Sequence, residues 1–517
     1  MSKKDRNRKN RKELRRRQRR IRFRLRNRVW DDQPRPMLRG VNLHYEIAER
    51  ARGMVVAGIG VIHQLVVRLG LVKAINRALS GLLKVHLPYW ESDHVLNIAY
   101  NIMCGGTRLE DIELRRNDEV FLDALGAQRI PDPTTAGDFT RRFEPHHVEA
   151  LQEAVNRKRL DVWAQQPQDF FNEAVLDVDG TLAPTYGERK EGMDITFKGS
   201  WGYHPLVVSL ANTREPLYLV NRRGNRPSHE GAAAYIDKSI ALCREAGFLR
   251  ILVRGDTDFS QTRHLDRWDD VEGVQFIFGM DASRALKQRA EELSSEDWRR
   301  LRRRPKYVVA TEPRTRRENV KERIVRERGF KNIRLNSEEV AEFDYQPSAC
   351  KKTYRIVVVR KNLTIESGED ALFDDIRYFF YITNRREVPA EGIVYEANDR
   401  CEQENLIEQL KNGVKALNMP VHDLASNWAY MVMAALAWSL KAWYALVLPT
   451  QGRWEDKHKA EKQTVLRMEF KRFLDEFIRL PCQVVIQGRR IVYKLLSWNR
   501  WSHVFLRGID AVEALPR

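Results

Sequence analysis

The stretch AVLDVDGT at residues 174–181 marks the point where the hydrophobic pattern of the chain changes. Short runs rich in valine and leucine begin here and predict further strands at PLVVSLA (205–211), PLYLVN (216–221), LRILVRGD (249–256) and VQFIFGM (274–280). An amphipathic helix, HEGAAAYIDKSIALCREAG (229–247), precedes the fourth strand, and a short helical segment precedes the fifth. Strands that alternate with helices in this way predict an α/β fold.

Two acidic pairs stand at the ends of two of these strands, Asp177 with Asp179 and Asp256 with Asp258. Open α/β sheets build their sites at such strand ends. Ionised aspartates there need exposure or a cation, and paired carboxylates suit Mg²⁺. Side chains alternate along a strand, so Asp177 and Asp179 share one face and geometry does not choose between them. The structural alternative is that these aspartates cap the next element.

A third carboxylate lies in YEANDRCEQENLIEQLKNG (395–413), which predicts a helix. Arg400 lies one turn before Glu404, and Lys411 lies almost two turns after it, so all three would share one helical face. A solvated face held by pairs four residues apart is the structural alternative. The R-x3-E-x6-K spacing nevertheless predicts a functional set.

That spacing resembles the Y-R-E-K signature of cut-and-paste insertion-sequence transposases with a DDE active site. The signature tyrosine belongs three residues before Arg400, where this chain has Ala397, so Tyr395 would substitute only with a slipped register. Other segments resemble the same family in order over residues 130–450. PDPTTAGDFTRRF (131–143) resembles its DNA-binding helix, LDVDGT (176–181) the strand that carries the first Asp, and GYHPL (202–206) the strand after it. VRGDTDF (253–259) resembles the strand that carries the second Asp, and YFFYITN (378–384) the strand that returns from an insertion.

The resemblance implies which acids act. Its D-x-T pattern selects Asp179, with Asp177 as the fallback, and its D-[ST]-x-F pattern selects Asp256 over Asp258. With Glu404 they would hold two Mg²⁺ or Mn²⁺ ions about 3.5–4 Å apart.

The same resemblance implies the DNA contacts and the partners. Arg400, Lys411 and Tyr395 would contact DNA phosphates beside the cut. The expected partners are double-stranded DNA, as terminal inverted repeats and target, and a second copy of the chain in a synaptic homodimer. Release of the element through hairpinned ends is a further expectation from the family.

The resemblance also implies an RNase H-like catalytic domain interrupted by a β-strand-rich insertion. The 148 residues between Asp256 and Glu404 leave room for that insertion. We therefore predict a basic arm (1–36), a helical N-terminal DNA-binding domain (37–165) and the first part of the catalytic domain (166–280). The β-strand-rich insertion (281–390), the second part of the catalytic domain (391–450) and a C-terminal helical region (451–517) would follow.

The charge of the chain is concentrated in the arm. Residues 1–28 hold 16 Lys and Arg against two acids, a net of +14 out of +19 for all 517 residues. Such a run binds polyanions through counterion release, although a solvated tail is the alternative. Arg141 and Arg142 in the 131–143 segment fit a DNA-recognition helix and an ordinary surface helix about equally.

The composition excludes several classes of protein. Hydrophobic residues make up 43%, which excludes wholesale disorder, and five dispersed cysteines without a C-x-x-C pair exclude a disulfide framework and a zinc ribbon. The most apolar run, 428–440, is shorter than the roughly 20 residues of a membrane span. We expect a cytoplasmic, nucleoid-associated protein with no membrane segment.

Two other functions stay open. DVDGTL (177–182) matches the signature of haloacid-dehalogenase-like phosphatases, in which Asp177 would be the nucleophile, although more than 170 residues precede it here. A catalytically silent, domesticated transposase that only binds DNA is the second.

Overall fold

The computed structural model describes residues 3–26, 43–46, 51–86, 88–187, 189–303, 320–329, 331–367, 370–488 and 490–516. The end of the predicted arm (27–36) and residues 304–319 of the predicted insertion lie outside these ranges. The chain divides into two compact units. A sheet unit comprises Pro167–Leu182 and Met193–Ile407, and a helical unit comprises Met1–Gln166, Ala183–Gly192 and Glu408–Arg517.

The sheet unit is built on one nine-stranded mixed sheet with the order β10-β11-β12-β13-β9-β8-β2-β6-β7. Strands β2, β8 and β9 are parallel to one another, and the remaining pairings are antiparallel. The five strands predicted between residues 174 and 280 are confirmed as β2 (Glu173–Gly180), β6 (Leu206–Leu210), β7 (Glu215–Val220), β8 (Arg250–Gly255) and β9 (Val274–Met280). A small antiparallel pair, β4 (Asp194–Ile195) and β5 (Trp201–Tyr203), lies between β2 and β6 in the chain.

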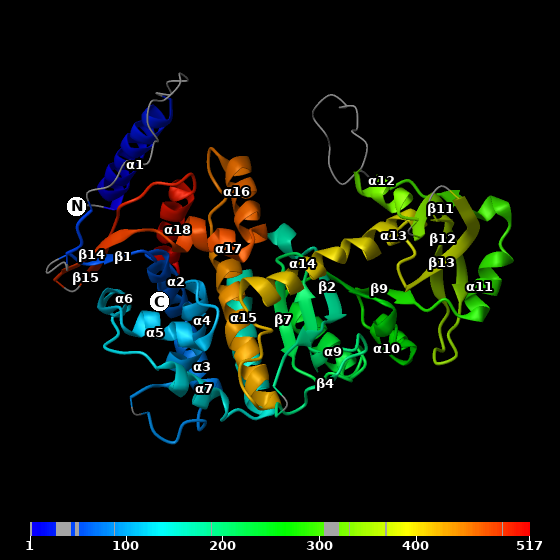
Figure 1. Cartoon of the computed structure of the whole chain (residues 1–517), viewed down its shortest axis with the longest axis horizontal. Helices are drawn as coiled ribbons and strands as arrows, with labels where there is room; N and C mark the ends of the chain where they lie inside the picture. Colours follow the sequence, from blue (N-terminus) through cyan, green and yellow to red (C-terminus); the bar gives the residue numbers. More distant parts are fainter. Residues whose placement is uncertain are drawn as a thin grey trace. The chain divides into compact units, whose positions relative to one another are not determined.

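Helices cover this sheet on both sides (Figure 1): α9 (Ala232–Ala246) and α10 (Leu265–Asp269) on one, α13 (Ala390–Asp399) and α14 (Cys401–Glu408) on the other. The predicted helix at 229–247 is α9, and it ends at Gly247, whose φ of +97° is readily adopted by glycine. The unit's shorter elements are η2 (Gln168–Phe171), η3 (Thr257–Phe259), η4 (Thr262–His264), α11 (Arg284–Glu291), η5 (Ser295–Asp297) and α12 (Val320–Glu327).

The segment between β9 and α13 extends the same sheet. Three long strands and one two-residue strand form this part: β10 (Arg299–Arg300), β11 (Lys331–Tyr345), β12 (Tyr354–Ser367) and β13 (Asp370–Thr383). Their only pairing with the other five strands, among the described residues, is a ladder of four residue pairs between Phe380–Thr383 of β13 and Ile277–Met280 of β9. Helix α13 packs over this junction, because Ile393 and Val394 share a core with Leu252, Ile277 and Val357.

The helical unit surrounds α15 (Leu424–Leu446), which is buried along nearly its whole length and packs against α4, α8 and α16. Gly58 in α2 lies so close to η7 that a Cβ there would stand 1.9 Å from the Phe477 carbonyl oxygen. The other helices of this unit are α1 (Lys3–Arg26), α2 (Gly58–Arg68), α3 (Leu71–Ala78), α4 (Glu91–Met103), η1 (Leu109–Asp111), α5 (Ile112–Arg116), α6 (Glu119–Leu125), α7 (Pro133–Thr140), α8 (Pro145–Trp163), η6 (Gln409–Gly413), α16 (Glu455–Arg467), α17 (Phe470–Phe473), η7 (Leu474–Ile478) and α18 (Ser502–Ala514).

Three further strands belong to the helical unit: β1 (Gly53–Met54), β14 (Cys482–Gln487) and β15 (Arg490–Leu495), in one antiparallel sheet. The two-residue β3 (Ala183–Pro184) is also assigned to it. Residues 408–450, predicted to belong with the catalytic domain, are grouped with this unit. In the part of the chain that the structure describes, no single helix is long and apolar enough to cross a membrane; the bent pair α2 and α3 meets that test by length and composition only.

Candidate active site

The ends of two neighbouring parallel strands bring the predicted aspartates together. Asp177 of β2 lies directly opposite Arg254 of β8. Asp179 and Asp256 each lie two residues further along, so alternation places them on the same face of the sheet. Burial and then the nearby Asp256 charge raise the pKa of Asp179 to about 6, opposed by Arg400. The Asp256 charge thus acts on Asp179, as expected of two carboxylates at neighbouring strand ends.

Asp177 has a different environment. Its side chain is 1% exposed, and Arg254 donates Nε to Oδ1 at 2.7 Å and Nη2 to Oδ2 at 2.9 Å. Burial raises the pKa of Asp177, and the Arg254 guanidinium opposes the rise. Arg254 also donates to the Glu396 carbonyl oxygen of α13 at 2.7 Å, so the pair ties β2, β8 and α13 together.

Asp179 forms an ion pair with Arg400, which lies between α13 and α14. Arg400 Nη1 lies 3.2 Å from Asp179 Oδ2, and the two side chains retain 22% and 18% of their exposure. Burial raises the pKa of Asp256 as well, and the Arg400 charge opposes that rise. One guanidinium thus acts on both aspartates.

Asp256 and Asp258 have different roles in the loop that follows β8. Asp256 caps the short helix η3, because its Oδ1 accepts the backbone N–H of Asp258 at 3.0 Å. Asp256 is half-buried, whereas Asp258 is exposed. The cap fixes the Asp256 carboxylate at the strand end.

The single helix predicted over 395–413 is wrong. The segment consists of α13, a turn at Arg400, α14 and the π-helix η6. Asn398 and Asp399 precede the turn, and such side chains compete with the helical backbone for hydrogen bonds. A spacing of seven gives two turns only in an unbroken α-helix, so the shared face predicted for Lys411, which lies in η6, has no support.

Glu404 lies in α14 next to a residue that fixes this helix. Gln403 is buried and donates its Nε2 to the carbonyl oxygens of Asp177 and Val207, each at 3.1 Å, which holds α14 against β2 and β6. Glu404 itself is exposed. Its neighbour Gln403 bonds the backbone of Asp177, two residues before Asp179, so α14 passes close to the strand end that carries Asp179.

Tyr395 and Arg141, two further predicted DNA contacts, have partners of their own in the structure. The Tyr395 hydroxyl donates to the Arg302 carbonyl oxygen at 2.5 Å. Arg141 and Arg142 do not lie on a helix as predicted, because α7 ends at Thr140 with Arg141 as its C-cap. Both arginines are exposed, and Arg141 pairs with Asp138.

The basic arm is helical over its described part. Fifteen of the 24 residues of α1 are Lys or Arg. Arg6 bonds Glu513 at 3.1 Å, Asn7 bonds Asp510 at 2.9 Å, and Arg17 donates to the Leu495 carbonyl oxygen at 2.9 Å. One face of α1 is therefore docked, and most of its other cationic side chains are exposed.

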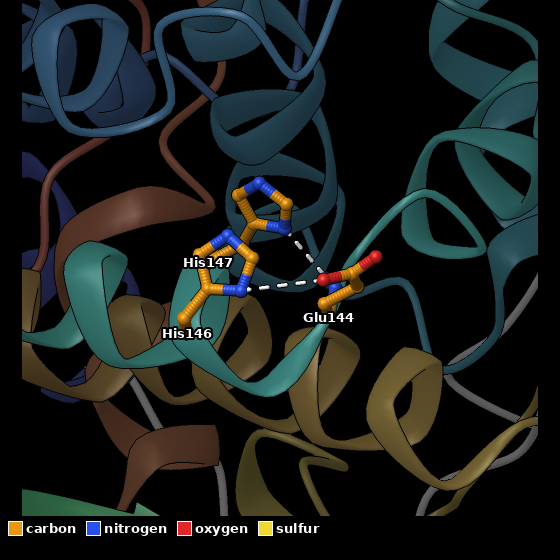
Figure 2. A group of neighbouring side chains, drawn as sticks. All are labelled: Glu144, His146 and His147. Carbon is orange, nitrogen blue, oxygen red and sulfur yellow. Dashed lines mark hydrogen bonds and ion pairs between the residues drawn. The ribbon is translucent and has the colours of Figure 1, made fainter.

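A second group with metal-ligating side chains lies at the start of α8 (Figure 2). The ligand atoms of Glu144, His146 and His147 lie within 4.8 Å of one another. His147 Nδ1, however, accepts the backbone N–H of Glu144 at 3.1 Å, and His146 pairs with the Glu144 carboxylate at 3.4 Å. A helix N-terminus also disfavours cations, so these contacts are better explained as capping.

Sequence reasoning missed Arg254 and Gln403. The signal for Arg254 is its place two residues before Asp256, which matches the place of Asp177 before Asp179. Given parallel pairing, that spacing puts the two charges opposite each other. Gln403 gave no signal, because its role depends on how α14 meets β2.

One family model matches most of the chain. The model of the family "Transposase DDE domain group 1" matches residues 52–517. A solved structure of the piggyBac transposase synaptic complex with hairpin DNA is similar at 10% identity, covering 82% of this chain and 83% of that chain, with a TM-score of 0.36 that is too low to carry an argument. No curated protein matches.

Proposed function

The chain belongs to the DDE transposase family, group 1, and is a DDE transposase; from this premise we propose that it excises and integrates an insertion sequence. The reaction would be phosphodiester hydrolysis followed by transfer of the freed 3′ end. Asp179, Asp256 and Glu404 would be the acidic set. The observation that carries the proposal is the position of Asp179 and Asp256 at the ends of the adjacent parallel strands β2 and β8, where the Arg400 charge acts on both carboxylates.

The sheet topology supports an RNase H-like catalytic domain. Counted from the β7 edge, these five strands lie in the order β7-β6-β2-β8-β9. The first strand in the chain, β2, is therefore central, with the second and third on one side of it and the fourth and fifth on the other. The second strand is antiparallel to the first, and the last two are parallel to it. This is the order expected of that fold, with β10–β13 as the predicted insertion.

The donor set fits divalent metal ions. Asp179 and Asp256 offer hard carboxylate oxygens, which Mg²⁺ and Mn²⁺ prefer. Burial, and to a smaller extent the Asp256 charge, raises the pKa of Asp179, so its ionised form is costly there and a bound cation would relieve that cost. When bound, two ions would activate the attacking oxygen and stabilise the leaving one. Glu404 would complete the set from α14, the helix that Gln403 fixes against β2.

The chain's own groups would position the DNA. Arg400 and Lys411 would bind phosphates, Arg400 bidentately and Lys411 as a compact charge, with Tyr395 as a further contact. The exposed face of α1 supplies many cations for sequence-independent binding. We propose the same partners as the resemblance implies: terminal inverted repeats, target DNA and a second copy of the chain, at the nucleoid.

The phosphatase alternative is disfavoured by a specific contact. A dehalogenase-like enzyme would need Asp177 as a nucleophile accessible to a phosphate ester. Asp177 is 1% exposed and both its oxygens are bound to Arg254. It is therefore placed to stabilise the sheet.

The test is cleavage of a duplex that carries the element's own end, identified from inverted repeats in the DNA flanking the gene. Asp179→Asn, Asp256→Asn and Glu404→Gln should each abolish cleavage in Mg²⁺ while a gel shift shows unchanged DNA binding. Asp258→Asn, in the same loop as Asp256, is the matched control and should cleave normally. Full cleavage by Asp179→Asn would refute the assignment. Binding without cleavage by the wild type would favour the silent DNA-binding protein.

A further inference from the structure

Arg400 places its positive charge beside the carboxylate that a bound metal ion would also contact. Its Nη1 is 3.2 Å from Asp179 Oδ2. Its charge opposes the rise in pKa that burial causes at Asp179 and at Asp256. Among the described residues, Arg400 forms the only ion pair with Asp179.

The neighbouring arginine does not share this role. Arg254 is 6% exposed, and its guanidinium is committed to both oxygens of Asp177 and to the Glu396 carbonyl oxygen. Arg400, in contrast, makes one contact with Asp179, remains partly exposed, and stands in the turn between α13 and α14. Its side chain can leave the carboxylate without breaking a buried network.

A metal ion and this ion pair require the same carboxylate oxygens. An ion bound to Asp179 would lie within a few ångströms of the guanidinium, and like charges at that distance repel strongly in a partly buried site. Cation binding therefore favours displacement of Arg400. A DNA phosphate offers the displaced guanidinium a bidentate partner.

We propose that Arg400 is an internal counter-ion that keeps the acidic site closed to divalent cations until DNA phosphate draws it away. This inference rests on the proposed function, since it takes Asp179 and Asp256 as the cation site. It makes DNA binding and cation binding mutually reinforcing, and such coupling is reciprocal: DNA tightens the cation site, and the cation tightens DNA binding.

The first test measures cation affinity without DNA. Mn²⁺ is titrated into the full chain, and free Mn²⁺ is followed by electron paramagnetic resonance. Arg400→Gln should bind Mn²⁺ about tenfold more tightly than the wild type, because the competing charge is gone. Arg400→Lys, which keeps the charge, should stay near the wild type. Arg267→Gln, which removes an arginine paired with Asp237 in the same unit, is the control and should change nothing.

The second test adds a duplex carrying the element's end. The wild type should then bind Mn²⁺ more tightly than it does alone, whereas Arg400→Gln should gain little. Equal gains in both proteins would overturn the proposed coupling. Mn²⁺ binding by Arg400→Gln that is no tighter than wild type in the absence of DNA would overturn the counter-ion role.

Two further arms keep the outcomes separate. Asp179→Asn should lose Mn²⁺ binding; if it binds normally, the acidic site itself is misassigned and the proposed function fails instead. A measurement on the unmodified chain covers the case in which Arg400→Gln does not fold. Phenylglyoxal modification of Arg400, quantified by peptide mass spectrometry, should increase when Mn²⁺ is added, and unchanged modification would contradict the displacement.

Discussion

Replacing Asp177 by asparagine should destabilise the sheet unit by about 3–5 kcal/mol, whereas the same change at Asp179 should cost less than about 1 kcal/mol. The two residues are separated by one position and share a strand face, so size and local backbone are matched. Only their partners differ. Asp177 neutralises a guanidinium that is almost fully buried, and Asp179 pairs with one that is partly exposed.

The magnitude follows from what Asp177→Asn leaves behind. Arg254, which is 6% exposed, would keep its charge and its hydrogen bond to the Glu396 carbonyl oxygen but would lose its carboxylate partner. An asparagine oxygen can accept one of the two lost hydrogen bonds but carries no charge. The cost is therefore that of an uncompensated buried cation rather than the net contribution of an ion pair.

Backbone hydrogen exchange followed by mass spectrometry suits a chain of two units, because it reports on β2 and β8 separately from the helical unit. Asp177→Asn should lower protection in those strands by roughly 100-fold or more, since each 1.4 kcal/mol corresponds to a factor of ten. The double variant Asp177→Leu/Arg254→Met should recover much of that loss. Wild-type protection in Asp177→Asn, together with a large loss in Asp179→Asn, would refute the assignment of roles.

Three other outcomes are expected. Burial, and then the Arg142 charge, lower the pKa of His94 to about 4 in the folded chain against 6.5 for a free histidine, so the unfolded state binds more protons between these values; urea unfolding should show up to about 3 kcal/mol of stability lost as pH falls from 6.5 to 4, and the loss should be smaller in His94→Gln. Deleting residues 2–28 should reduce the slope of log K against log salt by several units, at about 0.9 per phosphate contact, and an unchanged slope would make the arm a tail. Arg400→Ala and Lys411→Ala should each lower end cleavage by orders of magnitude with little change in melting temperature, and wild-type rates in both would refute their assignment as phosphate contacts.

Much of the sheet could be predicted, because its strands are short apolar runs whose ends are marked by Asp, Gly and Asn. The register between β2 and β8 could not, since periodicity within a strand carries no information about its neighbour. The role of Asp177 depends on that register. A motif match could favour Asp179, but only the position of Arg254 explains physically why the other aspartate is unsuited to the chemistry.

The interruption of the predicted helix around Glu404 could not be predicted from the sequence either. A regular spacing of charged residues predicted one α-helix, and local chemistry interrupted it at Arg400. Asn398 and Asp399 were visible in the sequence, yet their effect on the backbone is comparable to the propensities that favour a helix. The contact between Arg400 and Asp179 joins residues 221 positions apart, which no local pattern reports.

The four-residue ladder between β9 and β13 has a consequence for the solubility of the chain. Without β13, the strand β9 would present unpaired backbone groups along an open sheet edge, a template on which other chains can aggregate. The added strands move that edge outward to β11, which in the described part of the chain pairs with β10 only at Glu339 and Val340 and whose sequence KNIRLNSEEVAEFDY carries six charged residues. Charged side chains along an edge resist strand addition. Trimming the sheet to β2, β6, β7, β8 and β9 should therefore yield an aggregation-prone protein rather than a minimal enzyme.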